Sequence, residues 1–162
     1  MRFHLRRKDK EIADPQTMAQ VLRRAKYVTL AMVGRGEPYL VSLSHAYDEG
    51  EGCIYFHCAG EGKKLEILRA NPVVWGQALL DYGYHVGECS HLYASVMFKG
   101  RVEFIEDSEE KREALGLMIE ALDPEPEKIR DRLLSNQGLP GTVVGRVRIE
   151  YMTGKKSPEV EL

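Results

Sequence analysis

A glycine-rich turn that leads into two lysines is the segment of this sequence with the clearest chemical meaning. Phe56–Cys58 closes a run of strand-forming residues, Gly60 and Gly62 follow, and Lys63 and Lys64 open a short predicted helix. Free N–H groups at a helix start attract anions, lysine ammonium groups neutralise them, and glycine permits close approach of the main chain. The spacing is not that of a Walker A motif, and a solvated basic turn is an equally good interpretation. The turn is therefore a candidate phosphate site.

Histidine supplies the other candidate groups, because it titrates near neutrality and also ligates metals. The chain has five histidines, which are His4, His45, His57, His85 and His91. Taken singly, each is more often a packed or exposed imidazole than a ligand. Cys53 with His57, and Cys89 with His91, would each offer two metal ligands, but no acidic or cysteine cluster completes either pair. The sequence therefore predicts no metal site.

Ser95 is a polar residue in the otherwise apolar segment Tyr93–Phe98. A lone serine in a strand is usually a satisfied hydroxyl, but it can also hydrogen-bond a planar heterocycle that lies on the sheet. The chain shows no Ser-His-Asp order, no H-E-x-x-H and no G-x-G-x-x-G after a strand. These absences argue against the common hydrolase, zinc peptidase and Rossmann interpretations.

Strand-forming segments separated by turn residues must position these side chains. The predicted strands are 27–33, 39–47, 53–58, 73–80, 92–105 with a bend at Gly100, and 142–152. The predicted helices run from Asp14 to about Arg24, from Gly60 through Arg69, over 109–122, and over 124–134. Closely spaced antiparallel strands indicate a barrel or sandwich. Residues 81–91 have no clear period and are expected to form a long loop, of a length that often serves function.

Composition sets the broad class of the protein. The 162 residues fit one domain over 1–162, and 43% hydrophobic with 30% charged residues is typical of folded soluble proteins. A net charge of -2 favours neither nucleic acid nor an anionic membrane as partner, and no apolar run is long enough to span a bilayer. Three cysteines without close pairing are expected to be reduced thiols, so we expect a cytoplasmic protein.

The ordered motifs resemble those of the pyridoxamine-phosphate-oxidase-like flavin-binding split barrels, and more narrowly the nitroimidazole-resistance branch. The matching pieces run in family order over almost the full chain: Arg6–Glu11, Pro38–Leu43, Tyr55–His57, Gly62–Lys64, Asn71–Pro72, Tyr93–Val96 with Gly100, and Thr153–Lys155. Each piece alone is weakly diagnostic, whereas their common order and spacing is specific. The resemblance implies a mainly β fold with peripheral helices, a six-stranded antiparallel split β-barrel.

The resemblance also implies a cofactor and its contacts. Proteins of this kind are typically homodimers that hold flavin mononucleotide (FMN) in two sites at the subunit interface. The residues carried over to this chain are Lys63 and Lys64 at the flavin phosphate, the main chain of Val41, Ser42 and Leu43 along the isoalloxazine, Ser95 near its pyrimidine edge, and His57 with Cys58 close to the ring. His57 is the candidate catalytic residue, because it could position a substrate or donate a proton. A flavin-contacting polar residue is an equally good interpretation.

The sequence is consistent with two functions. The first is an FMN-dependent oxidoreductase that reduces a small flat electrophile such as a nitroaromatic, with the hard chemistry supplied by the cofactor. The second is a binding module without turnover that holds flavin or haem, with His45, His57, His85 and His91 as candidate axial ligands. Residues 82–88 match no family pattern and are expected to border the substrate side of the pocket. The segment 123–139 is expected to shape the interface or cover the barrel.

Overall fold

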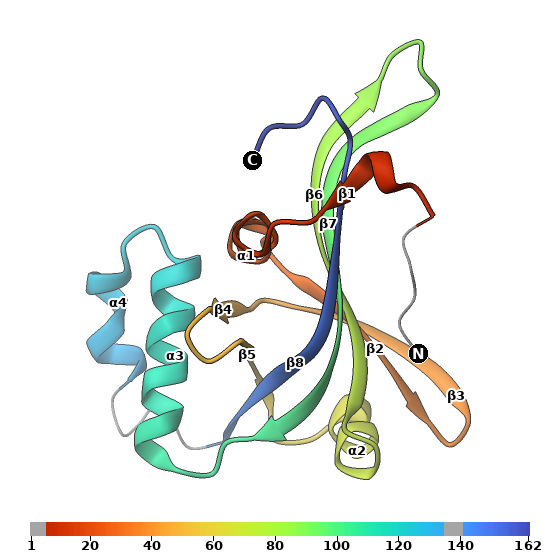
Figure 1. The fold of residues 1–162 in the computed structure, drawn as a ribbon. Helices are drawn as coiled ribbons and strands as arrows, with labels where there is room; N and C mark the ends of the chain where they lie inside the picture. The colour runs from red at the N-terminus through yellow and green to blue at the C-terminus, as the bar shows by residue number, and fades with distance from the viewer. Residues whose placement is uncertain (1–5, 135–140) are drawn as a thin grey trace.

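The sheet accounts for most of the architecture. The structure is a computed structural model that describes residues 6–134 and 141–162, and within them the chain forms a curved antiparallel sheet with helices packed around it (Figure 1). The strands are β1 (Glu11–Ile12), β2 (Val28–Gly34), β3 (Glu37–Leu43), β4 (Ala46–Asp48), β5 (Cys53–Ala59), β6 (Val73–His85), β7 (Ser90–Phe104) and β8 (Thr142–Lys156). Their order in the sheet is β3-β2-β6-β7-β8-β5-β4, and β1 pairs with β8.

Local signals place the helices close to where the sequence predicts them. The helices are α1 (Pro15–Arg24), α2 (Lys63–Ala70), α3 (Ser108–Leu122) and α4 (Pro126–Leu133), after a short 3-10 turn at Lys8–Lys10. The Asp14 carboxylate accepts the N–H of Thr17 at 2.9 Å, and Asp107 accepts that of Glu110 at 2.9 Å. These are N-cap contacts that satisfy otherwise unpaired donors. The last five residues predicted in segment 123–139 lie outside the described residues. None of the described helices combines the length and apolarity that crossing a membrane requires.

The predicted mainly β class with antiparallel strands is confirmed, but the strand count differs. The predicted strand 39–47 is interrupted at Ser44 and His45 and becomes β3 and β4, which lie at opposite ends of the sheet order. Short β1 adds a further strand. The interruption has a physical cause, because the His45 ring turns into the protein and its Nε2–H donates to the Leu22 carbonyl at 2.7 Å. The bend carries the chain from β3, which pairs with β2, to β4, which pairs with β5.

The predicted loop over 81–91 is wrong, because most of that segment is a β-hairpin. β6 continues to His85 and β7 begins at Ser90, with a register shift between Asp81 and Tyr84. Gly83 and Gly87 adopt φ values of 91° and 89°, which glycine tolerates at the irregularity and at the turn. The bend expected at Gly100 is confirmed by a register shift between Lys99 and Gly100.

Two apolar clusters hold the fold together. The larger fills the inside of the barrel and includes Leu22 of α1 together with Phe56 and Phe98 of the sheet. The smaller lies between α3 and the outer side of β4, β5 and β8, and includes Tyr55 and Met118. Side chains therefore alternate along β5, so that Phe56 and Cys58 point into the barrel and Tyr55 points toward α3.

His45 is a buried titratable group inside this framework. It is 3% exposed, and its Nδ1 has no hydrogen-bond partner among the described residues. A carbonyl only accepts, so the hydrogen bond to Leu22 fixes the proton on Nε2 and leaves Nδ1 as a buried acceptor. Burial lowers the pKa of His45 below its ordinary value of 6.5.

This lowered pKa predicts that acid destabilises the protein through His45. Below pH 6.5 His45 binds a proton in the unfolded chain but not in the folded protein. The free energy of unfolding therefore decreases as the pH is lowered from 6.5 to the pKa of His45 in the folded protein. The slope is at most about 1.4 kcal/mol per pH unit. Denaturant titrations of wild type and His45→Gln from pH 7 to pH 5 measure the difference, with exposed His91→Gln as the control. Equal slopes for wild type and His45→Gln would contradict this prediction.

Candidate functional site

The start of α2 has the geometry of an anion site. Gly62 precedes the helix with φ of 132°, a conformation that favours glycine, and no described side chain caps the helix. The N–H groups of Leu65 and Glu66 both reach back to the Gly62 carbonyl. Lys63 and Lys64 occupy the first two helical positions, so ammonium groups and main-chain N–H groups lie at the same helix end.

The two lysines lie close to β3 and β5. The Lys63 ammonium lies 4.8 Å from the centroid of the Tyr39 ring, a cation–π contact with β3. Burial raises the pKa of the Cys58 thiol, and the positive charge of nearby Lys64 partly offsets that effect. The structure thus brings Tyr39, Cys58, Lys63 and Lys64 into one region.

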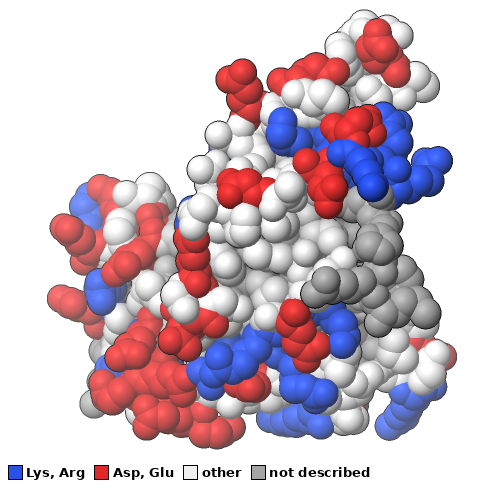
Figure 2. All heavy atoms as spheres, in the orientation of Figure 1, with Lys and Arg blue, Asp and Glu red and all other residues white. Residues whose placement is uncertain are grey.

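A cleft of about 370 Å³ lies beside Lys63, between α2 and the β2–β3 turn. Arg35 adds a second cation to its lining, while Glu37 and Glu66 add carboxylates. Basic side chains gather at the end of the molecule that holds α2, whereas acidic ones gather near the start of α3 (Figure 2). The two cations and two carboxylates of the cleft balance, so the case for an anionic ligand at α2 rests on the helix start with Lys63 and Lys64.

The segment Val41, Ser42 and Leu43 belongs to β3, which pairs only with β2 among the described strands. One backbone edge of β3 therefore has no strand partner there. The hydroxyl groups of Ser42 and Thr29 form a hydrogen bond of 3.0 Å. Val41 and Leu43 pack against the barrel core. An unpaired strand edge offers alternating N–H and C=O groups, which suits the edge of a planar heterocycle.

Ser95 lies apart from this region within one chain. It is 7% exposed on β7, and its Oγ donates to the Lys155 carbonyl at a long 3.5 Å. β2 and β6 lie between β3 and β7 in the sheet. β3 and β7 are therefore three strand spacings apart, or roughly 14 Å. The structure does not place Ser95 beside Val41–Leu43 of the same chain.

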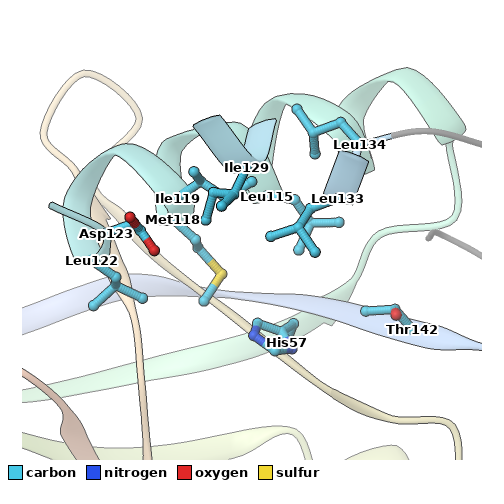
Figure 3. A pocket seen from close by; sticks show the side chains of 10 residues that line it. All are labelled: His57, Leu115, Met118, Ile119, Leu122, Asp123, Ile129, Leu133, Leu134 and Thr142. Carbon is cyan, nitrogen blue, oxygen red and sulfur yellow. The ribbon is translucent and has the colours of Figure 1, made fainter. Parts of the chain in front are cut away.

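His57 faces the outside of β5, away from Cys58, and lines a pocket beneath α3 and α4 (Figure 3). The pocket has a volume of about 260 Å³, and its lining is mostly aliphatic. The other lining residues are Leu115, Met118, Ile119, Leu122, Asp123, Ile129, Leu133, Leu134 and Thr142. Met118 reaches down from α3 toward the imidazole (Figure 3). The arrangement suits a small apolar ligand that hydrogen-bonds to one imidazole.

Ionic contacts hold the two helices above His57. Arg146 of β8 bonds to Glu103 of β7 at 2.8 Å and also to Glu110 of α3, which fixes α3 on the sheet. Arg130 of α4 bonds to Glu120 of α3 at 2.5 Å. Sequence reasoning missed this pocket. The helical spacing of Leu115, Met118, Ile119 and Leu122 could have indicated an apolar face, but not that the face lies over His57.

The other histidines and cysteines do not join these residues. Cys53 is buried at the far end of β5, while Cys89 and His91 lie on the β6–β7 hairpin. Across residues 6–134 and 141–162, no group of three or more His, Cys, Asp or Glu side chains is placed to hold a metal ion.

Comparison with known proteins identifies the family. The family model for pyridoxamine 5'-phosphate oxidase matches residues 14–156, which is most of the chain. The chain belongs to the pyridoxamine 5'-phosphate oxidase family. No curated protein sequence matches it. The family expected from the ordered motifs is therefore confirmed.

Solved structures share the fold of this family member. A protein of Bacteroides thetaiotaomicron assigned to 5-nitroimidazole antibiotic resistance is 28% identical, with a TM-score of 0.73 over 90% of this chain and 85% of that one. The flavocytochrome Anf3 of Azotobacter vinelandii is 22% identical, with a TM-score of 0.79 over 98% and 76%. A FAD and haem binding protein of Mycobacterium smegmatis is 17% identical, with a TM-score of 0.75 over 91% and 73%. The last two similarities establish the shared fold alone.

Proposed function

We propose that this member of the pyridoxamine 5'-phosphate oxidase family binds FMN and reduces a small flat electrophile such as a nitroaromatic. The observation that carries the proposal is the position of two sites at the same end of β5. His57 with its apolar pocket lies before the Gly60–Gly62 turn, and Lys63 and Lys64 lie directly after it. The candidate phosphate site at the helix start would anchor a flavin, and the small apolar pocket on the other face of β5 would take its acceptor.

Each part of the region has a role in this proposal. Lys63, Lys64 and the N–H groups at the start of α2 hold the single phosphate of FMN, and the unpaired edge of β3 hydrogen-bonds the isoalloxazine. His57 orients the acceptor or gives it a proton, while the aliphatic lining excludes water. When bound, FMN supplies the electrons. The similarity to the protein assigned to nitroimidazole resistance, which is 28% identical, supports this choice.

The test is to identify the cofactor and to measure turnover. We expect the purified protein to be yellow, to release FMN on acid extraction, and to bind added FMN in the micromolar range or tighter. After anaerobic reduction, a nitroaromatic should reoxidise it faster than it reoxidises free reduced FMN. A protein that binds FMN without any acceleration would refute the enzyme, and one that binds no flavin would refute the whole proposal.

Haem binding is the second candidate, and one observation favours it. His57 faces an apolar pocket in which Met118 approaches the imidazole, which is a suitable setting for an axial ligand (Figure 3). The pocket volume of about 260 Å³ is small even for drug-sized ligands, which favours the flat acceptor over haem. Titration with haemin decides between them, because haem ligation predicts a Soret band that His57→Ala abolishes.

A homodimer is part of the proposal, because the outer face of the sheet exposes several large apolar side chains. Val33 of β2, Leu40 of β3, Leu79 of β6 and Met97 of β7 are each 47–63% exposed. Alternation puts their side chains on the side opposite the barrel core, where they share the outer face of neighbouring strands with the polar residues Thr29, Ser42 and Gln77. Monomeric proteins rarely leave such a surface uncovered. A symmetric partner would cover it.

Charge on this face should therefore dissociate the dimer. We expect Leu79→Asp with Met97→Asp to raise the dimer dissociation constant at least a hundredfold, because two carboxylates per chain would lose hydration in the interface. Sedimentation equilibrium measures the change. Leu117→Asp on α3, which is 39% exposed and away from this face, serves as the control. A wild-type protein that stays monomeric at micromolar concentration would contradict the proposed homodimer.

A further inference from the structure

The cleft between α2 and the β2–β3 turn carries charges that the FMN proposal does not use (Figure 1). Its volume is about 370 Å³. Three of the lining residues are small or aliphatic, and they are Gly34, Ile67 and Ala70. The other four are charged, and they are Arg35, Glu37, Lys63 and Glu66. Only Lys63 has a role in the proposed FMN site.

The two walls of the cleft are held together by contacts within the chain. Gly34 lies directly against α2, because a Cβ there would come within 2.6 Å of Cγ1 of Ile67. The side-chain amide of Asn71, just after α2, donates to the Val33 carbonyl at 3.2 Å. The helix and the turn are therefore tied to one another, and the cleft is a built feature of the fold.

Arg35 stands on a tight turn at the edge of the cleft. Arg35 and Gly36 form the turn with φ values of 52° and 83°, and Gly34 pairs with Glu37 across it. These φ values match a type I′ turn, whose first position asparagine, aspartate or glycine usually occupies. An arginine with positive φ is uncommon there. The turn gives the Arg35 side chain a defined origin beside the cleft.

The charged side chains of the cleft do not neutralise one another. Across residues 6–134 and 141–162, none of the four forms an ion pair or a side-chain hydrogen bond, and Lys63 has only its cation–π contact. Elsewhere on the surface, Arg23 pairs with Glu49 at 2.5 Å and Lys99 with Glu150 at 2.9 Å. The two cations and two carboxylates are therefore available to a ligand.

The mixture of charges determines the chemistry of that ligand. Two carboxylates disfavour a bare anion, and two cations disfavour a metal ion or an amine. A ligand with both an anionic group and hydroxyl donors suits all four. Arginine and lysine bind phosphate, and a carboxylate accepts hydrogen bonds from ribose hydroxyls. The aliphatic part of the lining suits a flat base.

We propose that this cleft binds a ribonucleoside phosphate. Its phosphate contacts Arg35 and Lys63, its ribose hydroxyls donate to Glu37 and Glu66, and its base packs on Ile67. Because Lys63 also stands at the start of α2, this phosphate lies next to that of FMN, and this part of the inference rests on the proposed function. Such a group is one half of a nicotinamide dinucleotide, which reduces flavins, and one half of FAD.

Calorimetric titration with AMP tests the cleft, using the protein with and without FMN. Adenosine lacks the phosphate, and 2′-deoxy-AMP lacks one ribose hydroxyl. We expect AMP to bind about tenfold more tightly than either compound. Arg35→Gln should reduce the preference over adenosine at least about threefold, and Glu37→Gln with Glu66→Gln should do the same to the preference over 2′-deoxy-AMP. Arg69→Gln, on α2 but outside the cleft lining, is the control.

Two further measurements identify the source of the nucleotide. If it belongs to the electron donor, Arg35→Gln should raise the Michaelis constant for NADH but not for reduced nicotinamide mononucleotide, which lacks the adenylate. If it belongs to FAD, the same variant should weaken FAD binding but not FMN binding.

The outcomes separate the inference from the proposed function. Absence of AMP binding overturns the inference, and so do equal effects of Arg35→Gln and Arg69→Gln on AMP affinity. AMP binding that responds to Arg35→Gln in a protein that binds no flavin would refute the proposed function and leave the nucleotide cleft supported. FMN binding without AMP binding would refute the cleft alone.

Discussion

Replacing Lys63 and Lys64 together with alanine is expected to weaken FMN binding at least tenfold while leaving riboflavin binding almost unchanged. Both ammonium groups lie at the start of α2, where Gly62 leaves the helix uncapped. Each charge-assisted contact to a phosphate contributes about 1.5–3 kcal/mol, so losing two exceeds the 1.4 kcal/mol that corresponds to tenfold. Because riboflavin has no phosphate, its affinity should stay the same in this variant. Fluorescence quenching titrations with both ligands measure the two affinities.

Controls separate a phosphate contact from a general loss of positive charge. Lys26→Ala with Lys128→Ala removes the same charge from exposed positions away from α2, and should leave both affinities unchanged. Tyr39→Leu removes only the ring beneath the Lys63 ammonium, and should have a smaller effect on FMN than the double lysine change. Equal losses of FMN and riboflavin in the lysine variant would move the phosphate site elsewhere.

Features set by neighbouring residues were predictable from the sequence. Asp14 and Asp107 start helices because a side-chain oxygen caps N–H groups two or three residues later, and that signal is entirely local. The strands over 27–33 and 53–58 were predictable because their side chains alternate between the barrel core and the outside or α3. The bend at Gly100 has a clear cause, because a Cβ there would lie 2.4 Å from the Arg148 carbonyl oxygen.

Features set by distant residues were not predictable. The strand over 39–47 breaks at His45 because its ring bonds to Leu22, which lies 23 residues earlier in the chain. The hairpin over 81–91 was predicted as a loop because its residues are mostly exposed on both sides, so no apolar alternation marks the two strands.

The candidate site shows the same division. The turn at Gly62 and the lysines after it formed a local motif, so the helix start was predictable at the residue level. The α3–α4 cover over His57 depends on residues more than 50 positions away, and no local pattern shows which strand face a helix will cover. The separation of Ser95 from β3 depends on strand order, which the alternation of side chains does not specify.

A substitution of His57 should separate substrate chemistry from cofactor binding, because His57 lines the α3–α4 pocket. Its side chain points away from Cys58 and the lysine pair, so substitution should hardly disturb the phosphate end of FMN. We expect His57→Gln to keep FMN affinity within about twofold and to lower nitroaromatic turnover about a hundredfold, since general acid catalysis contributes at least that factor. Any pH dependence of turnover that comes from His57 should also disappear, because an amide does not titrate.

Met118→Leu is the matched control for His57→Gln, because it changes the same pocket at nearly constant volume and removes no titratable group. It should alter the Michaelis constant modestly and keep the shape of the pH–rate profile. A purely structural role for His57 predicts the opposite pattern, with FMN affinity and turnover falling together and an unchanged profile. If FMN affinity and turnover fall together in His57→Gln, His57 is not a proton donor. Intact FMN affinity with lowered turnover and a flat pH–rate profile would support an acceptor site in the α3–α4 pocket.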